Sequence, residues 1–351
     1  MKLALAIVVC GLLCWAAAKA GPVTRSDGAR PLYLPPTPAS AQNPAYSPDG
    51  SSLLFTIFHK GYNHGPAGMF FLTPGSSPRV LFDEPGYDAV NLPGTSWHRS
   101  GKIVFASDRQ DAGEQIWSIA ASGGQPTRIT QQSGKGNFQE PSFSPNARWI
   151  AFESPQGICK IQADGSGFAR LTHNQGDTQP NWSPRDNRIL FQRKGSGESW
   201  HLYTVDAEGK SAHALTSGNT SNTDASWSPD GRYIVFSSNQ DGLELPNLFV
   251  VNSQGGRPCR LTRSSKHYDG APTWSPDGRK VAFESREGDD EDDPTGLWVV
   301  DIDVSRYPLA NVKTRGGLSS RRLKSLPWKA PASFGSRCGT CWKVPHASSC
   351  W

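Results

Sequence analysis

The hydrophobic positions of this chain fall into short runs, each bounded by glycine, proline, serine or aspartate. Each of six such runs carries a phenylalanine: Phe55, Phe105, Phe152, Phe191, Phe236 and Phe283. The runs cover residues 53–58, 102–107, 149–154, 188–192, 233–238 and 280–285. Apolar runs of this length between turn residues predict β-strands, so we expect an all-β chain whose aromatic residues pack one sheet against the next.

A turn of one kind precedes each of these strands. Its fullest copies are Trp227-Ser-Pro-Asp-Gly231 and Trp274-Ser-Pro-Asp-Gly278. Serine at the first position, proline at the second and glycine at the fourth predict a type I turn. The aromatic residue before each turn recurs at intervals of 51, 46, 39, 45 and 47 residues: Tyr46, Trp97, Phe143, Trp182, Trp227 and Trp274. A period in this range is typical of β-propeller blades.

Two further strands complete each repeat. A third strand is expected at residues 115–120, 200–205, 248–252 and 296–301. A glycine-bearing hairpin then leads to a fourth strand, which ends at residues 128–130, 170–172, 214–216 and 260–262. Four strands per repeat predict a six-bladed β-propeller of four-stranded antiparallel blades over residues 21–303.

The sixth repeat lacks an evident fourth strand after Asp303, and we expect residues 31–34 to supply it. They lie nine residues before Pro44, and the fourth strands of the other repeats lie at a similar distance before the next repeat. As the outer strand of the last blade they would close the ring and cover its exposed edge. Deleting residues 21–36 should therefore lower the thermal midpoint more than deleting residues 304–351.

The repeats resemble those of the TolB-like (WD-like) six-bladed β-propeller family in three features. These are the Trp-Ser-Pro-Asp-Gly turn, the strand with Phe and Ser after it, and the closing Arg-Leu-Thr, as in Arg260–Thr262. The resemblance covers about residues 31–303 and implies a propeller that mostly binds proteins. In the protein that names the family, the propeller docks an outer-membrane lipoprotein. Because only about 25 residues lie between the expected signal peptide (residues 1–20) and the first repeat, the α/β domain of that protein is expected to be lacking here.

Both ends of the chain differ from the repeats. Lys2, the apolar run 3–18 and the small-x-small pattern Ala18-Lys19-Ala20 predict a signal peptide over residues 1–20, hence a secreted or periplasmic protein. Residues 304–351 contain nine basic side chains and no acidic one, which predicts a disordered tail. Its alternative role is binding to an anionic surface.

Charge and cysteine content exclude several classes of protein. Residues 21–303 carry 25 Lys and Arg against 31 Asp and Glu, so a nucleic-acid partner is not expected. No segment after residue 20 is apolar enough to span a membrane. We expect the protein to be a monomer. Five cysteines remain after residue 20 without regular spacing, and the Cys338-Gly-Thr-Cys341 pair has no partner motif, so we expect no disulfide framework, metal or cofactor.

Strand parity predicts where a binding site would lie. The loops between second and third strands share a face with the connections between blades. The longest of these loops belong to blades 1, 5 and 6, so a polar pocket is expected at that channel mouth. Candidate ligand-binding residues are His59, His64, Glu140, Asp224, His267, Tyr268 and Asp269, with Asn43 and Gln179 nearby. The alternative for the Asp and Asn residues before each repeat is that they cap turns.

No hydrolase elbow, zinc-protease, phosphate-loop or dinucleotide motif occurs in the sequence. The interpretation that fits best is a secreted, non-catalytic propeller that binds a protein or glycan partner through the loops at one channel mouth. The alternative is a carbohydrate-active enzyme of the polysaccharide lyase type, with His267 and Tyr268 as acid–base groups. Turnover on a glycan panel that disappears in His267→Ala would favour the enzyme.

Overall fold

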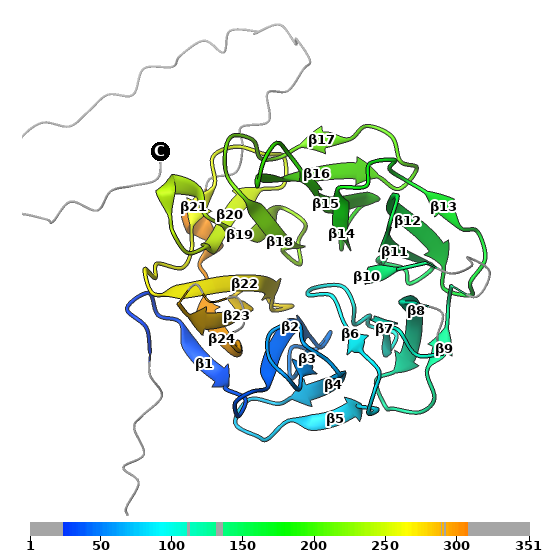
Figure 1. Cartoon of the computed structure of the whole chain (residues 1–351). Coiled ribbons are helices and arrows are strands. Elements are labelled where there is room, and N and C mark those ends of the chain that lie inside the picture. Colours follow the sequence, from blue (N-terminus) through cyan, green and yellow to red (C-terminus); the bar gives the residue numbers. More distant parts are fainter. Residues whose placement is uncertain (1–23, 111–112, 131–135, 289, 291–292, 308–351) are drawn as a thin grey trace, which may run out of the picture.

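The computed structural model describes residues 24–110, 113–130, 136–288, 290 and 293–307. Its strands form six separate four-stranded antiparallel sheets, which are arranged in a ring (Figure 1). This confirms the predicted all-β, six-bladed propeller. Within the described residues, no helix has the length and apolar character needed to cross a bilayer.

In the first five blades the strands follow one another from the inner to the outer edge in chain order. Blades 1 and 2 contain β2 (Ser40–Tyr46), β3 (Leu53–Phe58), β4 (Ala67–Leu72) and β5 (Arg79–Phe82), then β6 (Ala89–Val90), β7 (Lys102–Ser107), β8 (Gln115–Ala120) and β9 (Thr127–Arg128). Blade 3 contains β10 (Gln139–Phe143), β11 (Trp149–Ser154), β12 (Gly157–Gln162) and β13 (Ala169–Arg170). Blades 4 and 5 contain β14 (Asp177–Trp182), β15 (Arg188–Lys194), β16 (Trp200–Asp206) and β17 (His213–Ala214), then β18 (Asn222–Trp227), β19 (Tyr233–Ser238), β20 (Asn247–Asn252) and β21 (Cys259–Arg260).

The last blade joins the two ends of the ring. It is formed by β22 (His267–Trp274), β23 (Lys280–Glu287) and β24 (Gly296–Asp301), with β1 (Arg30–Tyr33) as the outer strand. β1 pairs antiparallel with β24, and Arg30 lies opposite Val299. The outer strand therefore begins and ends one residue earlier than the sequence pattern predicts.

The turn between the first and second strands has the predicted chemistry. In blade 1 the Gly50 N–H donates to the Ser47 carbonyl at 2.8 Å, and Gly50 has a φ of +75°. The Ser47 hydroxyl donates to Asp49 Oδ1 at 2.6 Å and accepts from the Ser52 N–H. The serine and aspartate side chains therefore stabilise the turn by hydrogen bonds within it, which explains why the motif recurs.

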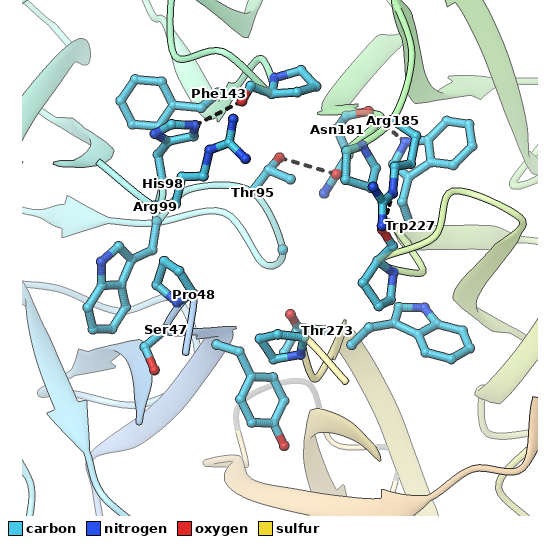
Figure 2. A pocket seen from close by; sticks show the side chains of 18 of the residues that line it. Ser47, Pro48, Thr95, His98, Arg99, Phe143, Asn181, Arg185, Trp227 and Thr273 are labelled. Carbon is cyan, nitrogen blue, oxygen red and sulfur yellow. Dashed lines mark hydrogen bonds between the residues drawn. The ribbon is translucent and has the colours of Figure 1, made fainter. Parts of the chain in front are cut away.

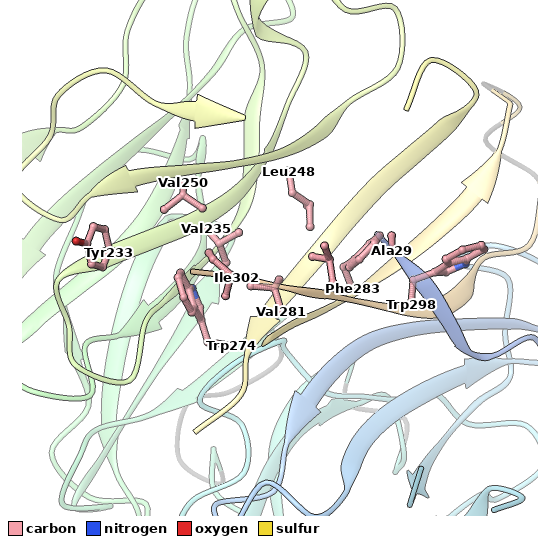
Figure 3. Packing of buried hydrophobic residues seen from close by; sticks show 11 residues of the cluster. Ala29, Tyr233, Val235, Leu248, Val250, Trp274, Val281, Phe283, Trp298 and Ile302 are labelled. Atoms are coloured by element: carbon pink, nitrogen blue, oxygen red, sulfur yellow. The ribbon is translucent and has the colours of Figure 1, made fainter. Parts of the chain in front are cut away.

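The hydrophobic core is divided among the six junctions between neighbouring blades. Each of the six buried clusters draws its residues from two adjacent blades. Figure 3 shows the junction of blades 5 and 6, where Val235 and Leu248 face Val281 and Phe283. All six phenylalanines of the second strands are at most 1% exposed, as their repeat positions predict.

A buried ion pair fastens the N-terminal segment to blade 6. Arg25 donates from Nη1 and Nη2 to the two carboxylate oxygens of Asp269 at 2.7 and 2.8 Å, and from Nη2 to Asp27 at 2.7 Å. These side chains are 7%, 0% and 2% exposed. The Arg25 guanidinium also lies over the rings of Phe283 and Trp298. Residues before β1 therefore contribute to ring closure as well as β1 itself.

Two short 3₁₀ helices, η1 (Gln240–Gly242) and η2 (Val304–Arg306), lie outside the sheets. Cys159 and Cys259 are buried. The predicted signal peptide, the Cys338–Cys341 pair and nearly all of the basic tail lie outside the described residues and stay predictions.

Candidate functional site

Five inner strands carry a β-bulge three residues before the aromatic residue of the turn. The bulge residue has a left-handed backbone, with φ between +44° and +55°: Asn43, Glu140, Gln179, Asp224 and Ala271. Non-glycine residues adopt this conformation at an energetic cost, and such strain concentrates at functional sites. The first four residues are those that the sequence placed before each repeat, and they lie in bulges of the inner strands rather than in turns.

A side chain of the preceding blade holds each of three bulges. Glu284 Oε2 accepts from the Asn43 N–H at 3.2 Å, Glu153 Oε2 from the Gln179 N–H at 3.3 Å, and Gln192 Oε1 from the Asp224 N–H at 3.1 Å. Each acceptor directly follows the core phenylalanine of a second strand. This position therefore places polar groups at the channel wall while the phenylalanine beside it remains in the core.

The bulges surround a cavity of about 320 Å³ at one channel mouth, to which all six blades contribute. The loop lengths predict a polar pocket near blades 5, 6 and 1, and the lining of this cavity comes from those blades and from blades 2, 3 and 4 as well. No Lys, Arg or His is found among the described lining residues, but five carboxylates are: Asp88, Glu114, Glu140, Asp224 and Glu284. The cavity is therefore strongly acidic when these groups are ionised.

Burial and mutual repulsion raise the pKa values of these carboxylates. Burial, then the charge of Asp224, raises the pKa of Glu284 to about 8. Burial raises the pKa of Glu153, beside the cavity, to about 7. The pKa of Glu140 lies well above its usual range because of burial and the neighbouring carboxylates. The cavity consequently gains negative charge as the pH rises through neutrality.

Two tyrosines and an arginine lie near Glu284. The Tyr62 hydroxyl donates to Glu284 Oε1 at 3.1 Å, and the nearby Glu284 charge, then burial, raises the pKa of Tyr62. The Arg286 guanidinium lies 4.9 Å from the centre of the Tyr62 ring and 4.2 Å from that of Tyr268. A Cβ on Gly270 would stand 2.7 Å from the Tyr268 ring, so this arrangement requires glycine at position 270.

The arrangement can bind a cation or exchange a proton. The Glu140 side chain lines the cavity and makes no hydrogen bond or ion pair with any described residue. An ammonium or guanidinium group would neutralise such carboxylates. Within the described part of the chain, no three His, Cys, Asp or Glu side chains are placed to hold a metal ion.

The predicted site residues separate into two groups. Glu140 and Asp224 line the cavity, and Tyr268 lies next to it through Tyr62. By contrast, none of the remaining four described candidates lines it. His59 contacts Asp83 at 3.0 Å, and His64 is exposed in the same loop. His267 packs against Trp298, and Asp269 binds Arg25.

Sequence reasoning missed Tyr62, Glu114, Glu153, Glu284 and Arg286. A signal for two of them exists, since Phe152-Glu153 and Phe283-Glu284 place a carboxylate within an apolar strand. A charged residue in a strand that is otherwise apolar predicts either an unfavourably buried charge or a side chain that faces a cavity. Tyr62 lies in the blade 1 loop that contains His59 and His64, but these two histidines, and not Tyr62, are the candidates that the sequence predicts.

Comparison with known proteins agrees with the architecture. The chain matches the family model described as the TolB beta propeller domain over residues 34–215 and 196–293. An uncharacterized protein of Agrobacterium fabrum is 28% identical over 203 residues, which is 53% of this chain and 65% of that protein. The Tol-Pal system protein TolB of Geobacter sulfurreducens is 34% identical over 82 residues, 22% of this chain and 18% of that protein. The chain thus spans less than two thirds of the length of these relatives.

Two solved structures share the fold. A protein described as a TolB from Agrobacterium tumefaciens has a TM-score of 0.57 at 20% identity, covering 76% of this chain and 92% of the other. Oligogalacturonate lyase in complex with manganese has a TM-score of 0.50 at 17% identity, covering 80% and 95%. A protein described as a TolB and a lyase therefore share this architecture, and the fold alone does not separate their functions.

Proposed function

This chain belongs to the TolB beta propeller domain family, and from that premise we propose that it is a non-catalytic binding propeller whose acidic channel mouth takes a basic side chain of a protein partner. The observation that carries the proposal is the set of five carboxylates around one cavity without a basic side chain among its described lining. A lysine or arginine inserted there would replace carboxylate repulsion by charge-assisted hydrogen bonds.

The energetics favour insertion of a charged side chain over loose surface attraction. Exposed charge pairs contribute little, whereas pairs in a partly desolvated site contribute more. Asp224 lies on a bulge whose N–H donates to Gln192 of the preceding blade, so its side chain starts from a fixed backbone. A site that is already in place loses little conformational entropy on binding. We further propose that the protein acts outside the cytoplasm, as its predicted signal peptide suggests. We also propose that it acts as a monomer.

Selection of displayed peptides on the full chain tests this function. At pH 8 we expect wild-type protein to enrich peptides with an exposed Lys or Arg, and Glu140→Gln/Asp224→Asn to lose that enrichment. Glu208→Gln/Glu244→Gln, which removes two exposed charges elsewhere, is the matched control. Enrichment of peptides without basic residues, or equal enrichment by both double variants, would refute the proposal. Specific retention of a neutral glycan in a parallel panel would also count against it.

A second candidate function is supported by the contact between Tyr62 and Glu284. A tyrosine hydroxyl 3.1 Å from a carboxylate whose pKa is about 8, with an arginine against the ring, is an arrangement suited to proton transfer in a carbohydrate-active enzyme. Turnover of acidic glycans that is lost in Tyr62→Phe, but kept in His267→Ala, would favour this enzyme. Both variants can be checked for folding by thermal melting.

A further inference from the structure

A second cavity, of about 420 Å³, lies at the opposite channel mouth. Its wall is formed by the turns between first and second strands of all six blades (Figure 2). The two cavities have no lining residue in common. This mouth is therefore a separate place on the molecule, and what it binds does not depend on the function proposed above.

A loop of blade 2 separates the two mouths. Residues 91–96 follow β6 and reach into the centre of the ring (Figure 1). Asn91 Nδ2 donates to the Asn43 carbonyl of blade 1 at 2.7 Å, and Asn181 Nδ2 of blade 4 donates to the Pro93 carbonyl at 3.0 Å. Gly94 lies so close to Asn181 that a Cβ would stand 2.8 Å from its Nδ2. The second cavity consequently has a floor and is not the end of an open channel.

The charge of the second cavity is opposite to that of the first. Its lining contains Arg99, Arg185 and His98, and no Asp or Glu among the described lining residues. These basic residues are departures from the repeat: His98-Arg99 replaces Ser-Pro in blade 2, and Arg185 replaces Asp in blade 4. Since the turn forms in other blades without them, folding of the turn does not explain their presence.

The geometry leaves both guanidinium groups available to a ligand. Arg185 Nε donates to the Pro229 carbonyl of the next blade at 3.0 Å, which fixes the side chain while its two terminal nitrogens make no hydrogen bond to the described residues. His98 Nε2 contacts the Pro145 carbonyl of the next blade at 3.1 Å. Neither arginine forms an ion pair within the described chain, and the two reach the opening from opposite sides (Figure 2).

Most of the rest of the wall is apolar. Five prolines and five aromatic residues line it: Pro48, Pro145, Pro184, Pro229 and Pro276, with Tyr46, Trp97, Phe143, Trp227 and Trp274. Trp227 and Trp274 are only 5% and 6% exposed, so their ring faces pack within the blades and cannot stack on a sugar. Proline rings and indole edges instead suit an aliphatic or aromatic side chain.

We propose that this mouth binds the carboxyl-terminal end of a polypeptide, with the α-carboxylate held by Arg99 and Arg185 and the last, apolar side chain against the proline and aromatic wall. Arginine is suited to this task because its planar fork matches the two oxygens of a carboxylate. The absence of acidic groups from the described lining removes competition for the two guanidinium groups. The inserted loop supplies the surface on which the chain end stops.

Titration calorimetry with acetyl-Gly-Pro-Phe tests this inference on the full chain. We expect the free acid to bind about tenfold or more tightly than its C-terminal amide, since the amide loses the charge-assisted contacts. Arg99→Gln and Arg185→Gln should each weaken binding of the acid about tenfold and leave the amide unchanged. Both residues are exposed, so these variants keep the fold, and thermal melting verifies it.

Arg232→Gln is the matched control, because Arg232 is an exposed arginine next to the turn of blade 5 that pairs with Asp230 and does not line the cavity. It should bind the acid like wild type. Equal affinity for acid and amide, unchanged affinity in both arginine variants, or no saturable binding at millimolar peptide would overturn the inference. Glucuronate binding as tightly as the peptide would overturn the assignment to a polypeptide end. Glu140→Gln affects only the acidic mouth, so the two sites fail independently.

Discussion

Replacing Glu284 by glutamine should stabilise the protein at alkaline pH and leave it nearly unchanged at pH 5. The Glu284 side chain is 3% exposed, accepts from the Asn43 N–H and the Tyr62 hydroxyl, and lies close enough to Asp224 to be repelled by it. Glutamine has the same size and keeps an oxygen acceptor for the Asn43 N–H. It differs chiefly in that it cannot take on the negative charge.

The magnitude follows from linkage between proton binding and folding. Below its ordinary pKa of 4.5 the carboxyl group is protonated in both states and adds no pH dependence. Between that value and about 8 the unfolded chain releases the proton while the folded chain keeps it, so stability falls as pH rises. At about 1.4 kcal/mol for each pH unit, wild type loses roughly 3–5 kcal/mol across this range through Glu284. The variant avoids that loss.

Urea denaturation at pH 5, 6.5 and 8 measures the difference. The gap between Glu284→Gln and wild type should widen with pH, to roughly 3–5 kcal/mol at pH 8. Glu287→Gln, an exposed change on the same strand, is the control and should follow wild type throughout. Parallel stability curves for wild type and Glu284→Gln would mean that Glu284 ionises like an exposed carboxylate, and the description of the acidic cavity would be wrong.

Two further changes test ring closure and the central loop. Arg25→Ala leaves the buried carboxylate of Asp269 without its bidentate partner and should lower the free energy of unfolding by about 3–5 kcal/mol in urea. A loss under 1 kcal/mol would show that the N-terminal segment does not fasten the ring. Gly94→Ala places a Cβ 2.8 Å from Asn181 Nδ2 at a φ of +89° and should cost about 2–3 kcal/mol by thermal melting. Gly123→Ala, at a φ of +92° with nothing within 4 Å, should cost only about 1 kcal/mol, and equal losses would refute the close approach.

The architecture could be predicted from the sequence because one repeated unit carries all of its determinants. Turn serine, proline and glycine, the aromatic residue before them and the phenylalanine after them each act locally, and six copies reinforce one prediction. The closing strand was also within reach, since the sixth repeat is visibly one strand short. Its position in the structure, Arg30–Tyr33, differs by one residue.

The site was less accessible because β-bulges change which side chains face the channel. Asp269 and Ala271 lie two residues apart in β22, and simple alternation would direct both to one side. The structure places Ala271 at the cavity and buries Asp269 against Arg25, with the register shift lying between Gly270 and Thr273. Similarly, Glu153 and Glu284 lie in strands whose other residues are mostly apolar, so the sequence predicts that these strands are buried in the core. A bulge depends on pairing between strands, which the order of residues along one strand does not reveal.

The central claim, that the acidic mouth recognises a basic side chain, is tested most directly by titrating the protein with the capped peptide acetyl-Gly-Arg-Gly-amide at pH 6 and pH 8.5 in low salt. Arginine keeps its charge across this range, so any change in affinity comes from the protein. Ionisation of Glu284, whose pKa burial and the charge of Asp224 raise to about 8, should tighten saturable binding about tenfold at the higher pH, and Glu284→Gln should abolish most of that gain. Equal affinity at both pH values, or a pH response retained in Glu284→Gln, would contradict the account.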